Sequence, residues 1–206
     1  MSATETPVVD VLETLRTAVL ANGGKEEDLR LLALPGVSED LAKTLVQCAK
    51  LLSDIRPVTV DYGSPQSDEE RAQLFTAMIA ACGFDYVNPN ITVANFPLSG
   101  TVQVEEEIIV LHFNRDIGSE AVIAEMAKLG LEPARLEHAC AFGKKYPDVQ
   151  REYPIVFLGS SCLVDGHRHV PCLYGYDSLR RLYLHCFDYG WHGLYRFAAV
   201  RTKKTK

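Results

Sequence analysis

The sequence predicts an α+β protein, in which an N-terminal helical segment precedes a mainly antiparallel sheet of hairpins covered by two or three helices. Apolar residues recur at helical spacing near the N-terminus. Segments rich in β-branched and aromatic residues dominate the C-terminal half, and turn-forming residues separate them. We therefore expect a small helical segment over residues 1–56 and an α+β domain over residues 57–206, with a hairpin-rich C-terminal half.

The composition is that of an ordinary globular protein. The 206 residues are 47% hydrophobic and 23% charged, with a formal net charge of −6. No apolar run reaches the roughly 18 residues that a membrane span needs. The first seven residues lack the basic and apolar regions of a secretory signal. We therefore expect a cytoplasmic protein without a membrane partner, whose six cysteines are reduced and mostly buried.

Residues 8–54 are predicted to form three short helices. The first ends at Asn22-Gly23-Gly24, because Gly tolerates the left-handed conformation of a helix C-cap. Leu34-Pro35-Gly36 separates the second helix from the third.

The hairpin between the second and third helices, Leu32–Ala42, resembles the helix-hairpin-helix DNA-binding motif. Ser38, however, stands where that motif has its second Gly, and the acidic residues that follow, Glu39 and Asp40, would repel phosphate. An ordinary turn between helices is therefore the preferred interpretation.

The α+β domain is predicted to begin with a strand over residues 57–62 and a helix over residues 68–82 that ends at Gly83. An irregular segment, 86–97, leads to a long strand over 101–113. Three acids, Glu105 to Glu107, interrupt this strand, so we expect a bulge or an exposed edge there, with one acid partly shielded.

Two further helices are predicted before residue 146. Ser119 is expected to cap the first, which ends at Gly130. Pro133 is expected to open the second, which reaches about Lys145. Both helices are expected to cover one face of the sheet.

The C-terminal region is predicted to be β-rich. Ile155–Leu158 is a continuous apolar run, typical of a buried strand. A first hairpin is expected to turn at Asp165-Gly166, a dipeptide that suits a two-residue turn. A second hairpin is expected between strands at 182–187 and 194–200, with residues 188–193 as its loop.

The second predicted hairpin holds the densest cluster of aromatic and polar side chains. Aromatic residues interleaved with His and Arg near a loop are typical of recognition surfaces. We therefore predict a ligand-binding surface made of Tyr183, His185, Asp188, Tyr189, Trp191, His192, Tyr195 and Arg196. Trp191 is expected to remain partly exposed, although packing within the sheet would explain about half of the aromatic residues.

The motifs indicate a binding protein rather than an enzyme. Gly159-Ser160-Ser161 lacks the Gly-x-Ser-x-Gly pattern of hydrolases, and no nucleotide-binding glycine motif is present. The leading hypothesis is a non-enzymatic binding or accessory protein that has a protein partner and needs no cofactor or metal.

Two alternative functions remain open. The first is a metal-dependent or thiol enzyme, because His residues two apart on a strand share a face. Its candidate groups are His167, His169, Cys186 and His192, with Cys162, Cys172 and His185 as further ligands. The second is a nucleic-acid-associated protein using the N-terminal helical hairpin and the basic tail, which the net charge of −6 disfavours.

Six short stretches between Val58 and Arg201 carry a resemblance to a protein family. They are Tyr86–Asn88, Asn95–Pro97, Leu111–Ile117, Lys144–Pro147, Pro154–Ser160 and Tyr195–Arg201. They resemble an uncharacterised family of bacterial and phage proteins, which implies no activity and no catalytic residues. The pattern Tyr195-Arg196-Phe197 in the last strand is more loosely similar to C-type-lectin-like folds, which implies a scaffold for ligand display, although the Trp-rich core motifs of those folds are missing.

Overall fold

The computed structural model describes residues 52–61, 67–98 and 103–201, together with nine isolated positions before residue 67. These positions are Arg16, Thr17, Val19, Leu20, Lys25, Glu39, Leu41, Lys43 and Pro65. The chain divides into two compact units, Met1–Lys50 and Leu51–Lys206. The predicted N-terminal helices, including the Leu32–Ala42 hairpin, lie largely outside the described residues. Every element named below belongs to the second unit.

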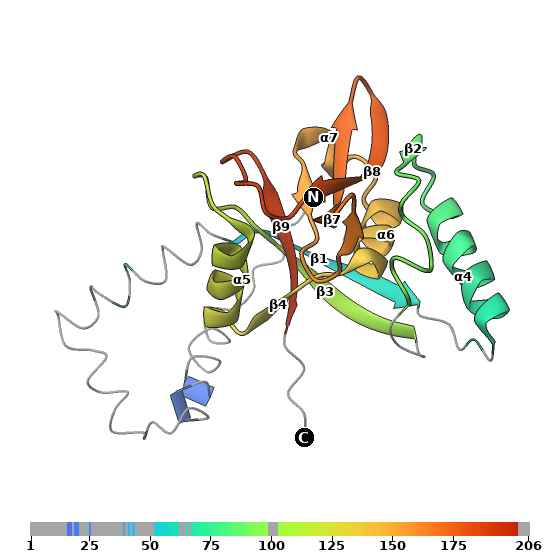
Figure 1. Cartoon of the computed structure of the whole chain (residues 1–206). Helices are drawn as coiled ribbons and strands as arrows, with labels where there is room; N and C mark the ends of the chain where they lie inside the picture. The colour runs from blue at the N-terminus through green and yellow to red at the C-terminus, as the bar shows by residue number, and fades with distance from the viewer. Residues whose placement is uncertain are drawn as a thin grey trace, which may run out of the picture. The chain divides into compact units, whose positions relative to one another are not determined.

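A nine-stranded, mostly antiparallel sheet with four helices forms this second unit (Figure 1). The strands are β1 (Leu52–Asp61), β2 (Tyr86–Val87), β3 (Gln103–Leu111), β4 (Leu131–Pro133), β5 (Ile155–Val156), β6 (Cys162–Val164), β7 (His167–Tyr176), β8 (Leu179–Cys186) and β9 (Arg196–Arg201). The helices are α4 (Asp68–Ala80), α5 (Ser119–Lys128), α6 (Leu136–Lys145) and α7 (Val149–Glu152). The predicted mixture of α and β structure is therefore confirmed.

The strand order is β1-β3-β9-β5-β7-β8-β2, with β4 paired to β9 and β6 paired to β7. Among the strand pairs that the structure describes, β2–β8 and β5–β9 are parallel. β9 therefore lies in the middle of the sheet, between β3 on one side and β4 and β5 on the other.

Both faces of the sheet are covered by helices. Four consecutive β3 residues, Ile108–Leu111, are all at most 2% exposed, which a strand with one solvated face would not show. Ile108 and Val110 belong to one core with residues of α4 and α6, whereas Ile109 and Leu111 belong to a second core with residues of α5. Figure 1 shows α5 and α6 on opposite sides of the sheet.

The prediction that both helices between 119 and 145 cover one face is therefore wrong. The short strand between them, β4, pairs with β9. The chain thus enters the sheet layer after α5 and leaves it on the other side before α6.

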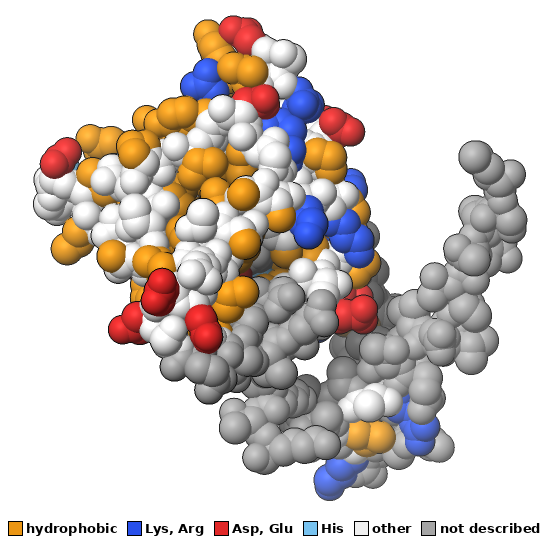
Figure 2. All heavy atoms as spheres, turned by 90° about the vertical axis from the view of Figure 1, so that its right-hand side faces the viewer, with side chains coloured by type: hydrophobic (Ala, Val, Ile, Leu, Met, Phe, Trp, Pro, Cys, Tyr) orange, Lys and Arg blue, Asp and Glu red, His pale blue; other side chains and the backbone are white. Residues whose placement is uncertain are grey.

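The face of the second unit that carries α4 is shown in Figure 2. Hydrophobic side chains gather near the centre of this view, and charged side chains lie mostly toward its edges. A cavity of about 220 Å³ lies between α4 and α6, lined in part by Leu74, Met78 and Cys140. Leu74 is 39% exposed, so α4 buries its apolar residues only in part.

The first strand differs from the predictions. β1 begins at Leu52, so the predicted helical region does not extend to residue 54; pairing with β3 overrides the local helical spacing there. The acidic segment of β3 shows the predicted exposed edge but not a bulge, because among the described residues Glu105–Glu107 pair with β1 alone while β9 pairs only with Ile109–Leu111. The register between the two strands is continuous across Glu105–Glu107, and the irregularity lies instead between Leu52 and Asp54. One acid is shielded as predicted: the Glu106 side chain is 10% exposed.

Two helix starts also differ from the predictions. Gly118, not Ser119, is the N-cap of α5, because the Ser119 hydroxyl is turned inward and donates to the Phe187 carbonyl. Pro133 lies in β4, so α6 begins only at Leu136. The predicted helix at 68–82 is confirmed as α4, which is followed by Gly83 with a φ of +60°.

The first predicted hairpin is confirmed, and the second is wrong. β6 and β7 turn at Asp165-Gly166, which have φ values of 51° and 79°. β8, however, pairs with β7 and turns at Asp177-Ser178, two residues with positive φ and without the Gly that signals such a turn. The segment 188–193 is therefore a connection between β8 and β9, which are separated by β5 and β7.

Ile155–Leu158 is buried throughout, as predicted, although only its first two residues form a strand. The five cysteines that the structure describes are free and buried. No helix in the described part of the chain is both long and apolar enough to cross a membrane.

Candidate functional site: a tyrosine-lined pocket

The ladder formed by β7 and β8 has two different faces. Residues directly opposite each other in an antiparallel pair point to the same face. The register pairs Leu173 with Leu182, and these two buried residues pack into the core that includes α6. We call this the helix-covered face.

The alternate residues of the ladder form the pocket face, which contains Tyr174, Tyr183 and His185. Tyr183 lies opposite Cys172 in the register, and Tyr174 lies opposite Arg181. Tyr183 is 37% exposed, so helices do not close this part of the face.

A cavity of about 410 Å³ opens on the pocket face, within the size range of small-ligand sites. It is lined by Gln150, Arg151, Glu152, Tyr153, Pro154, Cys172, Tyr174, Gly175, Tyr183, His185 and Tyr195. Four of these residues are tyrosines that come from different parts of the chain. We call this cavity the tyrosine-lined pocket.

The aromatic side chains of the pocket support one another. The Tyr174 and Tyr183 rings meet edge to face with centroids 6.0 Å apart. The His185 ring lies 5.7 Å from Tyr195 and 4.9 Å from Trp191. Such contacts hold aromatic rings in fixed orientations, which lowers the entropic cost of presenting them to a ligand.

Trp191 backs the pocket from inside the core and does not line it. It is 1% exposed, so the prediction that it remains partly exposed is wrong. Its indole N–H donates to the Ser119 hydroxyl at 2.7 Å, and two backbone hydrogen bonds join it to Ile117. These partners, far away in the sequence, draw the loop tip into the protein.

The residues of the predicted binding surface thus lie in different places in the structure. Tyr183, His185 and Tyr195 line the pocket, and the Arg196 guanidinium lies 4.8 Å from the centre of the Tyr153 ring beside them. Asp188, Tyr189 and His192 are exposed and do not line the pocket. Asp188 instead lies near His167 and Cys186.

The sequence reasoning missed the wall that α7 supplies. A Cβ on Gly175 would come within 2.8 Å of the Arg151 Cα, so the glycine permits the close approach of α7 to β7. A glycine between two tyrosines inside a strand is the signal that could have indicated such an approach.

One buried polar group of the pocket has unused hydrogen-bonding capacity. Gln150 is 1% exposed, and its side-chain N–H groups donate to the Tyr174 and Arg181 carbonyls at 3.0 and 3.2 Å. In the part of the chain that the structure describes, its Oε1 has no hydrogen-bond partner. A buried acceptor without a donor is unfavourable, so a donor from a ligand or water would be stabilised there.

Burial disfavours the charged forms of three titratable groups of the pocket, those of His185, Tyr195 and Cys172. Burial lowers the pKa of His185, and burial raises the pKa of Tyr195. Burial also raises the pKa of the Cys172 thiol to about 12, which removes its thiolate character. The lining therefore offers aromatic faces and hydrogen bonds, and its thiol is a poor nucleophile.

Comparison with known proteins adds no further information: no family model, no curated protein and no solved structure matches this chain. The resemblances to the bacterial and phage family and to C-type-lectin-like folds stay predictions.

Proposed function

We propose that this chain is a non-enzymatic binding protein and that the tyrosine-lined pocket is its recognition site. The observation that carries the proposal is a concave cavity walled by four tyrosines and a neutral histidine. Tyrosines supply large contact areas at low entropic cost, and for this reason they dominate recognition surfaces. The high pKa of Cys172 argues against thiol catalysis in the same cavity.

The proposed ligand is an aromatic side chain presented by a neutral or acidic segment of a protein partner. Arg196 already occupies the face of Tyr153, and the Arg181 guanidinium lies 5.9 Å from the centre of the Tyr174 ring. A cationic ligand would compete with these guanidinium groups for the ring faces. A planar group flanked by carboxylates would meet aromatic walls and a positive rim instead.

Trp191 offers a direct test, because it is the only Trp and its ring lies 5.1 Å from Tyr195 of the pocket. The full chain would be titrated with three short peptides while Trp fluorescence is followed. The first has one Phe flanked by Glu, the second has Phe flanked by Lys, and the third has Ala in place of Phe between Glu residues. We expect a saturable change with the first peptide, weaker binding of the second and no response to the third.

Two matched variants separate the pocket from the rest of the surface. Tyr183→Ala should weaken binding of the first peptide about tenfold or more, since a central aromatic residue commonly contributes about 2 kcal/mol. Tyr189→Ala removes a tyrosine that is 65% exposed and outside the pocket, so it should leave the affinity unchanged. Equal losses in the two variants, or no saturable response to any peptide, would contradict the proposal.

A further inference from the structure

Three different metal-ligating side chains converge at the end of the β7–β8 ladder farthest from its Asp177-Ser178 turn. The register pairs His169 with Cys186. The Phe187 amide donates to the Arg168 carbonyl at 2.7 Å, which continues the ladder by one step. Asp188 therefore comes beside His167, on the same face as Cys186.

The donor atoms of these side chains are close enough to share one ion. The ligand atoms of His167, Cys186 and Asp188 all lie within 4.8 Å of one another. A tetrahedral zinc ion with bonds of about 2.0–2.3 Å holds its ligand atoms about 3.3–3.8 Å apart. Small rotations of the two exposed side chains, His167 and Asp188, would close the remaining distance.

We propose that His167, Cys186 and Asp188 form a Zn²⁺ site that is separate from the tyrosine-lined pocket. An imidazole nitrogen, a thiolate and a carboxylate oxygen are the three ligand types that zinc uses in proteins. Cys186 is 7% exposed and supplies an anchored inner ligand, whereas the other two approach from the solvent side. Because His167 and Asp188 are exposed, water would supply the fourth ligand.

The site goes beyond the proposed binding function and does not depend on it. A single buried cysteine or a single exposed histidine is ordinary in a folded protein. The distinguishing feature is that two strands and the following loop bring three unlike ligands together. The ion would join the start of β7 to the first turn of the segment 187–195, which carries Trp191 and Tyr195.

Cobalt spectroscopy tests the site directly. The full chain would be treated with a chelator, kept reduced with a phosphine and titrated with Co²⁺. We expect the intense visible bands of tetrahedral cobalt and a near-ultraviolet thiolate-to-cobalt charge-transfer band, both abolished when Zn²⁺ is added in equal amount. A spectrum of octahedral cobalt without the charge-transfer band would overturn the proposal.

Variants assign the ligands. Cys186→Ser should remove the charge-transfer band, whereas Cys172→Ser, on the other face of the ladder, should keep it. His167→Ala and Asp188→Asn change exposed side chains, so the fold should tolerate both substitutions. Each should lower the Zn²⁺ affinity by more than about tenfold, because loss of even an outer-shell partner commonly costs 10–100-fold.

The control for the exposed ligands is His192→Ala, another exposed histidine of the same C-terminal region, which should bind Zn²⁺ like the unmodified chain. If His192→Ala weakens binding as much as His167→Ala does, the ion is held elsewhere and the assignment is wrong. If Cys186→Ser does not fold, the two exposed variants still decide the question.

Discussion

Arg180 and Arg181 are neighbours on β8, yet they lie in opposite environments. Arg180 points into the helix-covered side of the ladder and is 8% exposed. Arg181 points to the pocket face, where its guanidinium lies 5.2–5.9 Å from the centres of three tyrosine rings, those of Tyr86, Tyr174 and Tyr176. Strand alternation alone thus separates a side chain that holds the fold together from one that borders the candidate site.

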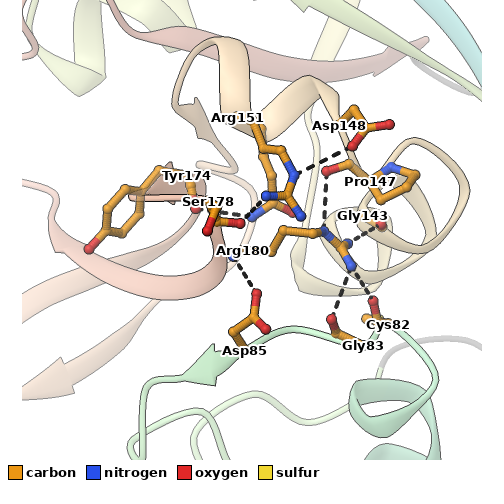
Figure 3. A network of polar contacts seen from close by, with 11 residues as sticks. Cys82, Gly83, Asp85, Gly143, Pro147, Asp148, Arg151, Tyr174, Ser178 and Arg180 are labelled. Atoms are coloured by element: carbon orange, nitrogen blue, oxygen red, sulfur yellow. Dashed lines mark hydrogen bonds and ion pairs between the residues drawn. The ribbon is translucent and has the colours of Figure 1, made fainter.

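Arg180 joins the C-terminal ends of two helices. Figure 3 shows its guanidinium directed at the backbone carbonyls of Cys82, Gly83, Gly143 and Pro147. The first two follow α4, and Gly143 lies in the last turn of α6. Carbonyls at a helix C-terminus lack partners within the helix and carry a partial negative charge, so a cation that donates several hydrogen bonds satisfies both needs.

The different environments of Arg180 and Arg181 indicate where this protein can accommodate a ligand. On the helix-covered face, the hydrogen-bonding groups around Arg180 have partners within the chain. On the pocket face, aromatic rings remain accessible and Gln150 keeps a buried acceptor without a donor among the described residues. A ligand can therefore add interactions on the pocket face without breaking existing ones.

The largest expected change is in the free energy of unfolding, when Arg180 and Arg181 are each replaced by methionine in separate variants. Arg180→Met should lower the free energy of unfolding by about 3 kcal/mol or more, because each buried carbonyl left without a donor costs about 1–3 kcal/mol. Arg181→Met should change it by less than about 1 kcal/mol, as partly exposed residues commonly do. Urea unfolding followed by circular dichroism measures both, and similar losses would contradict the comparison.

A smaller decrease in the free energy of unfolding is expected when Trp191, which supports the pocket from inside the core, is replaced. Trp191→Phe removes the hydrogen bond to Ser119 and leaves a small cavity, which should cost about 2 kcal/mol. Tyr189→Phe is the matched control, because Tyr189 is 65% exposed and its replacement should change stability by less than about 0.5 kcal/mol. The same urea unfolding experiment measures both variants. If Trp191→Phe lowers the free energy of unfolding no more than the control does, Trp191 is not a core residue.

The smallest expected effect is a dependence of stability on pH that arises from His138 in α6. The Arg135 amide donates to His138 Nδ1, so the ring carries its proton on Nε2 and donates it to Glu106 at 2.7 Å. Burial lowers the pKa of His138 below 6.5, and the hydrogen bond to Glu106 only partly opposes this effect. The unfolded chain then binds more protons than the folded one at mildly acidic pH, so acid favours unfolding.

The free energy of unfolding should therefore be constant above about pH 7 and fall as the pH is lowered through 6.5. His138→Gln should flatten this slope, and His185 should contribute the remainder because burial lowers its pKa too. Urea unfolding at a series of pH values measures the effect, and stability that rises toward pH 5 would contradict it.

The sequence predicted local features best where a single residue type determines the backbone. Gly83 and Asp165-Gly166 adopt the positive φ values that their positions in the sequence indicated. The turn at Asp177-Ser178 was missed, because neither residue is a Gly and the strands on both sides look like those of many other pairings. Because that turn was missed, β8 was predicted to pair with β9, whereas it pairs with β7.

Part of the candidate site was also predictable. Tyr183, His185 and Tyr195 were singled out by their aromatic and polar pattern, and they do line one pocket. Gln150 and Tyr153 were not, since they reach the pocket only through the packing of α7 on β7. Trp191 was misplaced for a related reason: its hydrogen-bond partner Ser119 lies 72 residues away.

By itself, the sequence determined the class of structure, the main strands and helices, and the first hairpin, because apolar spacing and turn residues act over a few neighbouring positions. Only the tertiary structure decided which strands pair, which helices lie on which face and which aromatic residues stay accessible. These choices depend on contacts between distant segments, such as the hydrogen bonds of Arg180 to the ends of α4 and α6. The energies of such contacts cannot be read from the residues that are neighbours in the sequence.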